Sequence, residues 1–233
     1  MKIGVCYFGQ PRLCEHGLIT KDWFVQSNYV ENIHNYFHLW QPSYAHELIN
    51  SISRFEYQHN NGYTLNKLLD IYNPIDYKFE LQKEFDITHI KLKEKSDDMI
   101  YSCRVISMLF SISETIKLVN DSDLDVLILK RTDLKLQNQI DLNSFDLNKL
   151  NMPDWRGSVM PNSMYTTNPV YVDFIAIGKL NILQSYASLY IKLQNFSNEK
   201  CWVPEYLFAD HIINEKLEVN EIKLGELYTN YLL

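Results

Sequence analysis

Cysteine is scarce in this chain, and its spacing does not indicate a disulfide framework. The sequence holds four cysteines in 233 residues, Cys6, Cys14, Cys103 and Cys201, and none of them belongs to a Cys-x-x-Cys pair. Cysteines this few and this far apart are typical of free thiols in a reducing compartment. We therefore expect unpaired thiols rather than structural disulfides.

Long apolar runs and an excess of positive charge are also absent. No run approaches the roughly 20 apolar residues that span a bilayer, and the N-terminal KIGVCYF is too short for the core of a signal peptide. The formal net charge of −7 argues against a nucleic-acid backbone or an anionic membrane as the main partner. We expect a cytoplasmic protein without a transmembrane segment. The alternative is a peripheral position at a membrane, held by a partner.

Two phosphate-binding signatures are missing. No Gly-x-x-x-x-Gly-Lys-Ser/Thr sequence occurs, which excludes a P-loop protein. The segment GQPRLCEHG, which follows the first predicted strand, lacks the glycine-rich loop with a lysine that a nucleotidyltransferase would show. A local basic site for a small phosphate remains compatible with the composition.

Alternating strand and helix patterns are the main signal along the chain. Apolar β-rich segments predict strands, and apolar residues at helical spacing predict helices. We predict strands at 2–8, 35–40, 76–81, within 123–136 and at 170–178, and helices at 20–30, 44–53, 64–72, 98–119, 179–194 and 204–215, with a long loop at 137–170. This order predicts an α/β fold with a mostly parallel sheet flanked by helices, in a single domain over residues 1–233.

The stretch VLILKRTDLKL, residues 126–136, joins a buried strand to a cluster of charge. Its apolar start is followed at once by Lys130, Arg131 and Asp133. In open α/β sheets the carboxyl ends of the strands are where ligands bind. Arg131 and Asp133 are therefore candidates for a ligand site, and a solvated surface ion pair is the alternative.

Several short motifs occur in a characteristic order along the chain. They are GVCYFGQPR, YFHLW, YNP followed by DYKFE, YSCRVISMLF, DVLILKRTDLKL, DFIAIG and PEYLFADHI. Their order resembles that of glycosyltransferase-like proteins from bacterial and giant-virus polysaccharide gene clusters, within the nucleotide-diphospho-sugar transferase superfamily. The resemblance runs from Met1 to about Glu215. It implies a GT-A-like, Rossmann-type sheet that binds a sugar nucleotide at the carboxyl ends of its strands.

The resemblance also implies a site for the nucleotide. The loop from Phe8 to Arg12, with Gly9 and Gln10, would cradle the nucleoside. Arg131-Thr132-Asp133 would stand where the family has an acidic Asp-x-Asp motif that holds Mn²⁺ or Mg²⁺. The first acidic position is an arginine here, so Asp133 alone would serve the metal, and metal dependence is in doubt. The guanidinium of Arg131 could instead neutralise the diphosphate directly.

Further candidates follow from the chemistry of sugar transfer. Tyr101 and Arg104 share one face of the predicted helix 98–119, and an arginine on this apolar face needs a phosphate or a carboxylate as partner. A structural pair with an aspartate is as good an account of Arg104. An inverting transferase also needs a group that takes the acceptor proton. We nominate Asp173, in an otherwise apolar strand, and Glu205, although a first-turn position alone also explains Glu205.

The function predicted from these patterns is a glycosyltransferase. It would move a sugar from a nucleotide-diphosphate donor to a glycan or another hydroxyl acceptor. The alternatives are a non-catalytic nucleotide- or glycan-binding module on the same fold and a nucleotidyltransferase. His38 and Trp40 are interpreted as structural, and Trp155, Arg156 and Tyr165 as residues on which an acceptor sugar could stack.

Overall fold

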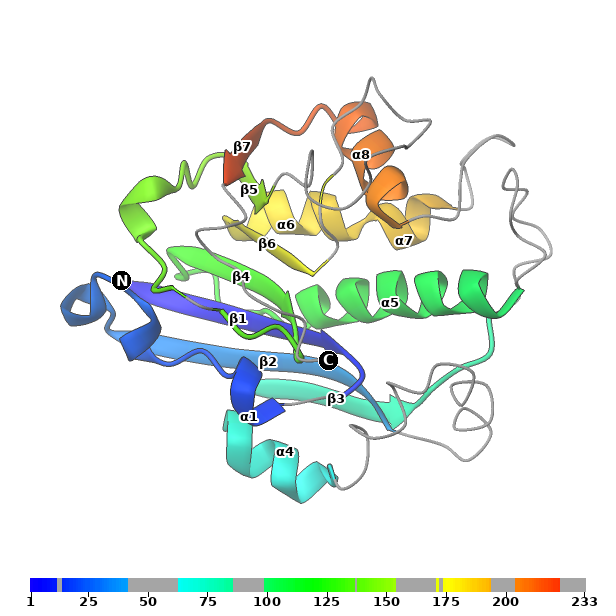
Figure 1. Ribbon diagram of the computed structural model, residues 1–233, viewed down its shortest axis with the longest axis horizontal. Coiled ribbons are helices and arrows are strands. Elements are labelled where there is room, and N and C mark those ends of the chain that lie inside the picture. Colours follow the sequence, from blue (N-terminus) through cyan, green and yellow to red (C-terminus); the bar gives the residue numbers. More distant parts are fainter. Residues whose placement is uncertain are drawn as a thin grey trace.

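A single sheet with helices on both faces forms the frame of the protein (Figure 1). The computed structural model describes residues 1–11, 14–41, 63–85, 99–136, 138–153, 171, 174–193 and 204–222, and it describes residues 99–103 through their backbone only. All statements below concern these residues. The predicted helix 44–53 and the loop residues Trp155, Arg156 and Tyr165 lie outside them.

In the part of the chain that the structure describes, the sheet has seven strands in the order β3-β2-β1-β4-β6-β5-β7. The strands are β1 (Lys2–Gly9), β2 (Asn32–Gln41), β3 (Asp76–Leu81), β4 (Val126–Arg131), β5 (Leu150–Pro153), β6 (Ile175–Gly178) and β7 (Val219–Ile222). The pairs β1–β2, β1–β4, β2–β3 and β5–β7 are parallel, whereas β6 is antiparallel to both β4 and β5. The predicted α/β class with a mostly parallel sheet is therefore confirmed.

Two hydrophobic cores, one on each face of the sheet, explain why β1 and β4 are apolar at nearly every position. Successive side chains of a strand point to opposite faces. Ile3, Val5 and Tyr7 accordingly belong to one core, while Cys6 and Phe8 belong to the other. Strands buried on both faces lose the alternation of polar and apolar residues.

The helices divide between the two faces, as Figure 1 shows. They are α1 (Cys14–Gly17), α4 (Leu65–Tyr72), α5 (Met99–Lys117), α6 (Leu180–Ala187), α7 (Leu189–Lys192) and α8 (Pro204–Asn214). Helices α5 to α8 cover the face of Cys6 and Phe8, while α1 and α4 lie on the other. No helix in the described ranges combines the length and apolar character needed to cross a membrane.

Most predicted elements are present. The predicted helix 179–194 is divided into α6 and α7, the strand predicted at 170–178 is β6 over Ile175–Gly178, and two further regions differ more. Strand β3 has the predicted bounds, and α4, α5 and α8 begin and end within two residues of prediction. Residues 20–30 do not form a helix but two short 3₁₀ turns, η1 (Lys21–Trp23) and η2 (Ser27–Tyr29). The predicted loop 137–170 contains the 3₁₀ turn η3 (Leu142–Ser144) and strand β5, and strand β7 was not predicted.

A long-range contact accounts for the missing helix. The backbone N–H of Val25 donates to the carbonyl of Ile140, and the N–H of Ile140 donates to the carbonyl of Trp23. These bonds use backbone groups that an α-helix over 20–30 would need for itself. Phe24 is fully buried as a result of this pairing.

Gly17, the last residue of α1, offers a direct test of how tightly this face is packed. A Cβ atom built on Gly17 would lie 1.8 Å from the carbonyl oxygen of Thr132, a backbone atom that cannot simply rotate away. We expect Gly17→Ala to lower the free energy of unfolding by about 3 kcal/mol or more, since overpacking against backbone is costly.

Gly9→Ala is the matched control. Gly9 has φ +96° but nothing within 4 Å of the place that a Cβ atom would take, so only backbone strain opposes alanine there. A loss of about 1 kcal/mol is expected. Urea unfolding of both variants measures the difference, and equal losses would contradict this account of Gly17.

Candidate functional site

A pocket of about 160 Å³ lies at the carboxyl ends of the parallel strands. The strand order reverses between β1 and β4, and in open α/β sheets the crevice at this point is where ligands bind. The pocket is lined by residues that end β1, β2 and β4, that follow β3, or that lie on α5: Phe8, Gly9, Gln10, Trp40, Gln82, Arg104, Ser107, Met108, Arg131, Thr132 and Asp133.

Strand register and helix spacing explain why these residues meet. Phe8 is aligned with His38 of β2 on one side and with Arg131 of β4 on the other. Residues aligned in a parallel sheet point to the same face, here the face covered by α5. On α5 itself, Arg104, Ser107 and Met108 are spaced i, i+3 and i+4 and therefore share one side of the helix.

The structure brings together six of the residues predicted to bind the ligand. Phe8, Gly9, Gln10, Arg104, Arg131 and Asp133 all line this pocket. Glu205 lies in the first turn of α8 and is not among the lining residues. Arg12 and Asp173 lie outside the described residues, and Tyr101 belongs to α5 by its backbone only, so their predicted roles stay predictions.

Five lining residues were not among the predicted site residues: Trp40, Gln82, Ser107, Met108 and Thr132. Trp40 was interpreted as structural. It is the last residue but one of β2, aligned with Glu80 of β3, and it forms part of the pocket wall. The signal for Trp40 was its place just before the strand-breaking Gln41-Pro42, at a carboxyl end. Gln82 and Ser107 gave no comparable signal, because their approach depends on how α5 packs against the end of β3.

Arg131 and Asp133 form a two-point ion pair at the edge of the pocket. Arg131 Nε donates to Asp133 Oδ1 at 3.0 Å, and Nη2 donates to Oδ2 at 2.7 Å. The side chains are 24% and 18% exposed, so the pair lies partly out of water. The carboxylate fixes the plane of the guanidinium, which limits the entropy that Arg131 would lose on binding a ligand.

This arrangement does not fit a divalent cation at Asp133. Both carboxylate oxygens already accept hydrogen bonds from a guanidinium, and a metal ion there would face its positive charge. Within the described ranges, no three side chains of His, Cys, Asp or Glu gather closely enough to hold a metal ion. On the geometry of its ion pair, Asp133 is a poor ligand for the Mn²⁺ or Mg²⁺ that the family resemblance implies, and the metal itself stays a prediction.

A second bond ties the two strand ends that flank the crevice. Thr132 Oγ1 donates to the carbonyl oxygen of Gln10 at 2.6 Å. It joins the loop after β4 to the turn after β1. This bond fixes the distance between the turn after β1 and the loop after β4.

Aromatic rings form the wall at the β2 end of the pocket. Trp40 stacks on Phe110 of α5, with ring centroids 5.6 Å apart and planes 23° apart. Phe85 and Tyr190 meet Phe110 at 5.6 and 5.1 Å between centroids. Such packing holds the indole of Trp40 rigid, so the pocket has one rigid apolar side and one charged side.

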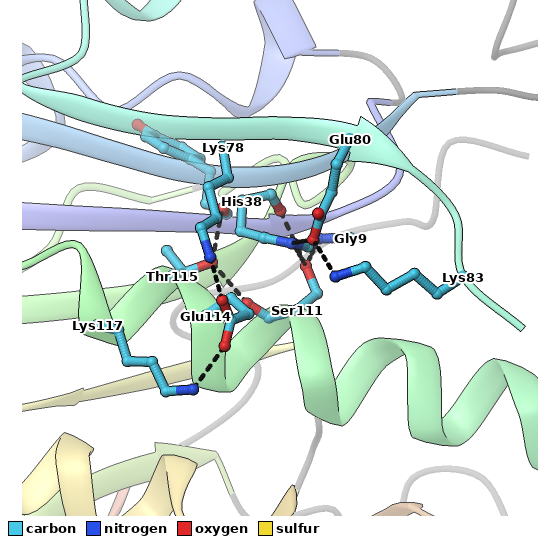
Figure 2. A network of polar contacts seen from close by, with 10 residues as sticks. Gly9, His38, Lys78, Glu80, Lys83, Ser111, Glu114, Thr115 and Lys117 are labelled. Carbon is cyan, nitrogen blue, oxygen red and sulfur yellow. Dashed lines mark hydrogen bonds and ion pairs between the residues drawn. The ribbon is translucent and has the colours of Figure 1, made fainter. Parts of the chain in front are cut away.

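A buried polar network joins the turn after β1 to α5, β2 and β3 (Figure 2). Gly9 N–H donates to Ser111 Oγ at 2.9 Å, and Ser111 Oγ lies 2.8 Å from His38 Nδ1. The other ring nitrogen of His38, Nε2, lies 2.9 Å from Glu80 Oε1, and Lys83 donates to the same oxygen at 3.0 Å.

The protonation states of the network follow from its charges. Burial raises the pKa of Glu80, but the hydrogen bonds from His38 and Lys83 outweigh it and lower that pKa overall, so Glu80 is a carboxylate that only accepts. Burial also lowers the pKa of His38, which makes the ring neutral at pH 7. We therefore assign the ring proton to Nε2, so that Nδ1 accepts from the hydroxyl of Ser111.

Ser111, His38 and Glu80 are linked by hydrogen bonds in the order found in a catalytic triad. The geometry argues against a nucleophilic role for Ser111. Ser111 is 0% exposed and does not line the pocket. Its Oγ already accepts the N–H of Gly9. A nucleophile has to reach its substrate, so this network holds the turn in place rather than attacking a ligand.

Lys130 lies beneath the pocket, on the opposite face of β4 from Arg131. Its Nζ is fully buried and donates to the carbonyl oxygens of Gly17 and Leu134 at 2.6 and 2.9 Å. Burial lowers the pKa of Lys130 to about 7, although the charge of Asp133 acts in the other direction. The lysine fastens α1 and the loop after β4 to the sheet.

Comparison with known proteins adds no family to this description. No protein-family model matches the sequence, and no curated protein matches it.

The buried ammonium of Lys130 predicts a particular pH dependence of stability. Above pH 7 the folded chain releases this proton, while the unfolded chain keeps it until pH approaches 10.5. The unfolded state then binds more protons, so raising the pH favours folding. Relative to Lys130→Met, which does not titrate, the wild type should gain on the order of 1 kcal/mol per pH unit between pH 7 and pH 10.

Urea unfolding of both proteins at several pH values measures this difference. A constant difference across the range would mean that Lys130 keeps its proton in the folded state. The two carbonyl bonds would then outweigh the cost of burial.

Proposed function

We propose that this pocket binds a nucleotide-diphosphate sugar and that the protein is a glycosyltransferase with a GT-A-like fold. The observation that carries the proposal is the position of the pocket. It lies at the reversal point of the strand order and is lined by Arg104, Arg131 and the turn at Gly9. A sugar nucleotide has a planar base and a charged diphosphate, and the two sides of this pocket suit these two parts.

Each side of the pocket has a place in this proposal. The backbone at Gly9 and Gln10 and the rigid indole of Trp40 would receive the nucleoside. Arg104 and Arg131 would bind the diphosphate, whose negative charge grows as the sugar departs. Guanidinium groups held in place before the reaction stabilise that charge without having to reorganise.

The order of the sheet supports the same proposal. The antiparallel strand β6 between β4 and β5 is compatible with a GT-A-like sheet, and the motifs that resemble the family fall on β1, β2, α5, β4, β6 and α8. Because the geometry of Asp133 does not fit a divalent cation, the arginines would supply the positive charge at the diphosphate. The catalytic roles of Asp173 and Glu205 remain predictions within this proposal.

One observation favours a second function, a non-catalytic nucleotide-binding module. Asp133, the only carboxylate among the described lining residues, is engaged by Arg131 on both oxygens. A base for the acceptor proton would then have to come from elsewhere in the chain. Binding without sugar transfer is the result expected for such a module.

Titration with UDP, GDP, CDP and dTDP tests the binding half of the proposal. We expect one of these nucleotides to raise the melting temperature, and we expect its affinity to be the same in EDTA as in Mn²⁺. Calorimetry measures the affinity in both conditions. Binding that appears only with Mn²⁺ would contradict the metal-free arrangement, and no response to any nucleotide would contradict the proposed function.

Removing one guanidinium tests its role at the diphosphate. We expect Arg131→Met or Arg104→Met to weaken binding of the active nucleotide about 10- to 100-fold, as the loss of a charge-assisted bond implies. Lys179→Met is the control, because it removes one positive charge from the start of α6, outside the pocket lining. An affinity unchanged in both arginine variants would assign the two arginines to structure alone.

A further inference from the structure

We propose that Ser111 is a positioning residue, which holds the Gly9 peptide at the wall of the pocket and is itself oriented by His38 and Glu80. The inference rests on the proposed function only for the choice of ligand. Its structural part concerns a backbone group, the N–H of Gly9, whose behaviour can be measured without any ligand. Figure 2 shows the residues involved.

Two other contacts hold the neighbourhood of this turn: Gly9 is aligned with Leu39 of β2, and the Gln10 carbonyl accepts from Thr132 Oγ1. Neither of them connects the turn to α5. Gly9 has φ +96°, a conformation that glycine adopts without penalty and leaves without penalty. Nothing lies within 4 Å of the place where its Cβ would be, so side-chain packing does not confine it. The bond from Gly9 N–H to Ser111 Oγ, at 2.9 Å, is therefore the contact that defines this peptide relative to α5.

Ser111 is suited to this task because its own position is fixed from three directions. It belongs to the middle of α5, it is fully buried, and its Oγ lies 2.8 Å from His38 Nδ1 and 2.9 Å from the carbonyl oxygen of His38. The hydroxyl hydrogen can be donated to either of these two acceptors. In both cases Oγ keeps a lone pair for the N–H of Gly9.

Because the hydroxyl has two acceptors to choose from, the hydrogen bond from Gly9 N–H to Ser111 Oγ can form whether His38 is neutral or protonated. With a neutral ring, the hydroxyl donates to Nδ1. With a protonated ring, Nδ1 donates to Oγ and the hydroxyl turns to the carbonyl of His38. The charged groups around the ring are Glu80 and Lys78 of β3, Lys83 after it, and Glu114 of α5, and both carboxylates stabilise the protonated form.

Glu80 anchors the far end of the network. It accepts from His38 Nε2 at 2.9 Å and from Lys83 at 3.0 Å, and it is 30% exposed. The ring of His38 is also held between Trp40 and Phe110, in edge contacts of 4.8 and 5.5 Å between centroids. The aromatic wall and the turn at Gly9 are thereby joined through one imidazole.

The test compares Ser111→Ala with Thr115→Val. Thr115 lies one turn further along α5, is equally buried, and donates to the carbonyl oxygens of Ser111 and Tyr7 at 2.8 and 3.3 Å without contacting Gly9. Both variants lose one buried hydroxyl, but Ser111→Ala also takes the acceptor from the Gly9 N–H. We expect stability to fall by about 1 kcal/mol in Thr115→Val and by about 1–3 kcal/mol in Ser111→Ala. Only Ser111→Ala should change the pocket.

Amide hydrogen exchange at Gly9, followed by NMR, is the first readout and needs no ligand. We expect about 10-fold faster local exchange at Gly9 in Ser111→Ala and an unchanged rate in Thr115→Val, after correction for global stability. Affinity for the nucleoside diphosphate that binds the wild type is the second readout. It should weaken about 10-fold in Ser111→Ala alone.

The outcomes separate this inference from the proposed function. If Gly9 exchange is the same in Ser111→Ala as in wild type, or if the variant binds the nucleotide as tightly, the positioning role is overturned. If no nucleotide binds the wild type, the proposed function falls, and Gly9 exchange still decides the role of Ser111.

Glu80 provides variants that alter the network from its exposed end, should Ser111→Ala fail to fold. Glu80→Ala removes the acceptor for His38 Nε2 and should speed Gly9 exchange about 3-fold. Glu80→Gln keeps an acceptor oxygen and should restore the wild-type rate. Equal exchange in the two Glu80 variants would remove His38 and Glu80 from the positioning role.

Discussion

The parallel pairing of β1 with both β2 and β4 is the constraint on which the candidate site depends. It aligns Phe8 with His38 on one side and with Arg131 on the other, and it brings three strand ends to one edge. Backbone groups at this edge leave the ladder of the sheet and need other partners. The side chains of Ser111 and Thr132 provide two of them, at Gly9 N–H and at the Gln10 carbonyl.

Alternation along β4 separates two positive charges that are neighbours in the sequence. Lys130 points to the α1 face, where carbonyl oxygens enclose it, while Arg131 points to the α5 face and the pocket. Lys130 and Arg131 therefore have different roles. Burial makes Lys130 a structural group whose charge is costly, whereas Arg131 keeps its charge beside Asp133 at partial exposure.

The sequence predicts the strands that meet at the pocket better than it predicts the rest of the fold. The apolar residues of 2–8 and the run Val126–Leu129 indicated buried strands, which the structure contains as β1 and β4, and the pocket lies at their carboxyl ends. The helix predicted for 20–30 failed because Val25 pairs with Ile140, a partner more than 100 residues away. Strand β5 was missed for a different reason, since its four residues are too few to show a period.

Among the residues that line the pocket, those nominated from the sequence lie at the ends of β1 and β4 and on α5, and whether they bind a ligand stays a prediction. Arg131 was nominated from the charged end of its own strand, and Gly9 from the resemblance to the glycosyltransferase-like family; both line the pocket. Gln82 and Ser107 meet only because α5 crosses the end of β3, where Gln82 Nε2 donates to Ser107 Oγ at 3.1 Å. His38 was interpreted as structural, and its link to Ser111 and Glu80 spans three elements, so no spacing in the sequence indicates it.

The direction of the buried network follows from the cost of burying charge. Its charged members, Glu80 and Lys83, lie at the outer end beside the edge strand β3, where water still reaches them. Its inner members, His38 and Ser111, are 0% exposed and neutral at pH 7. A network built in this order avoids a full charge in the core and still ends in an oxygen that can accept from Gly9. Because His38 and Ser111 are neutral, burying them costs less than burying a charge would. Ser111 Oγ can therefore accept from Gly9 N–H next to the pocket.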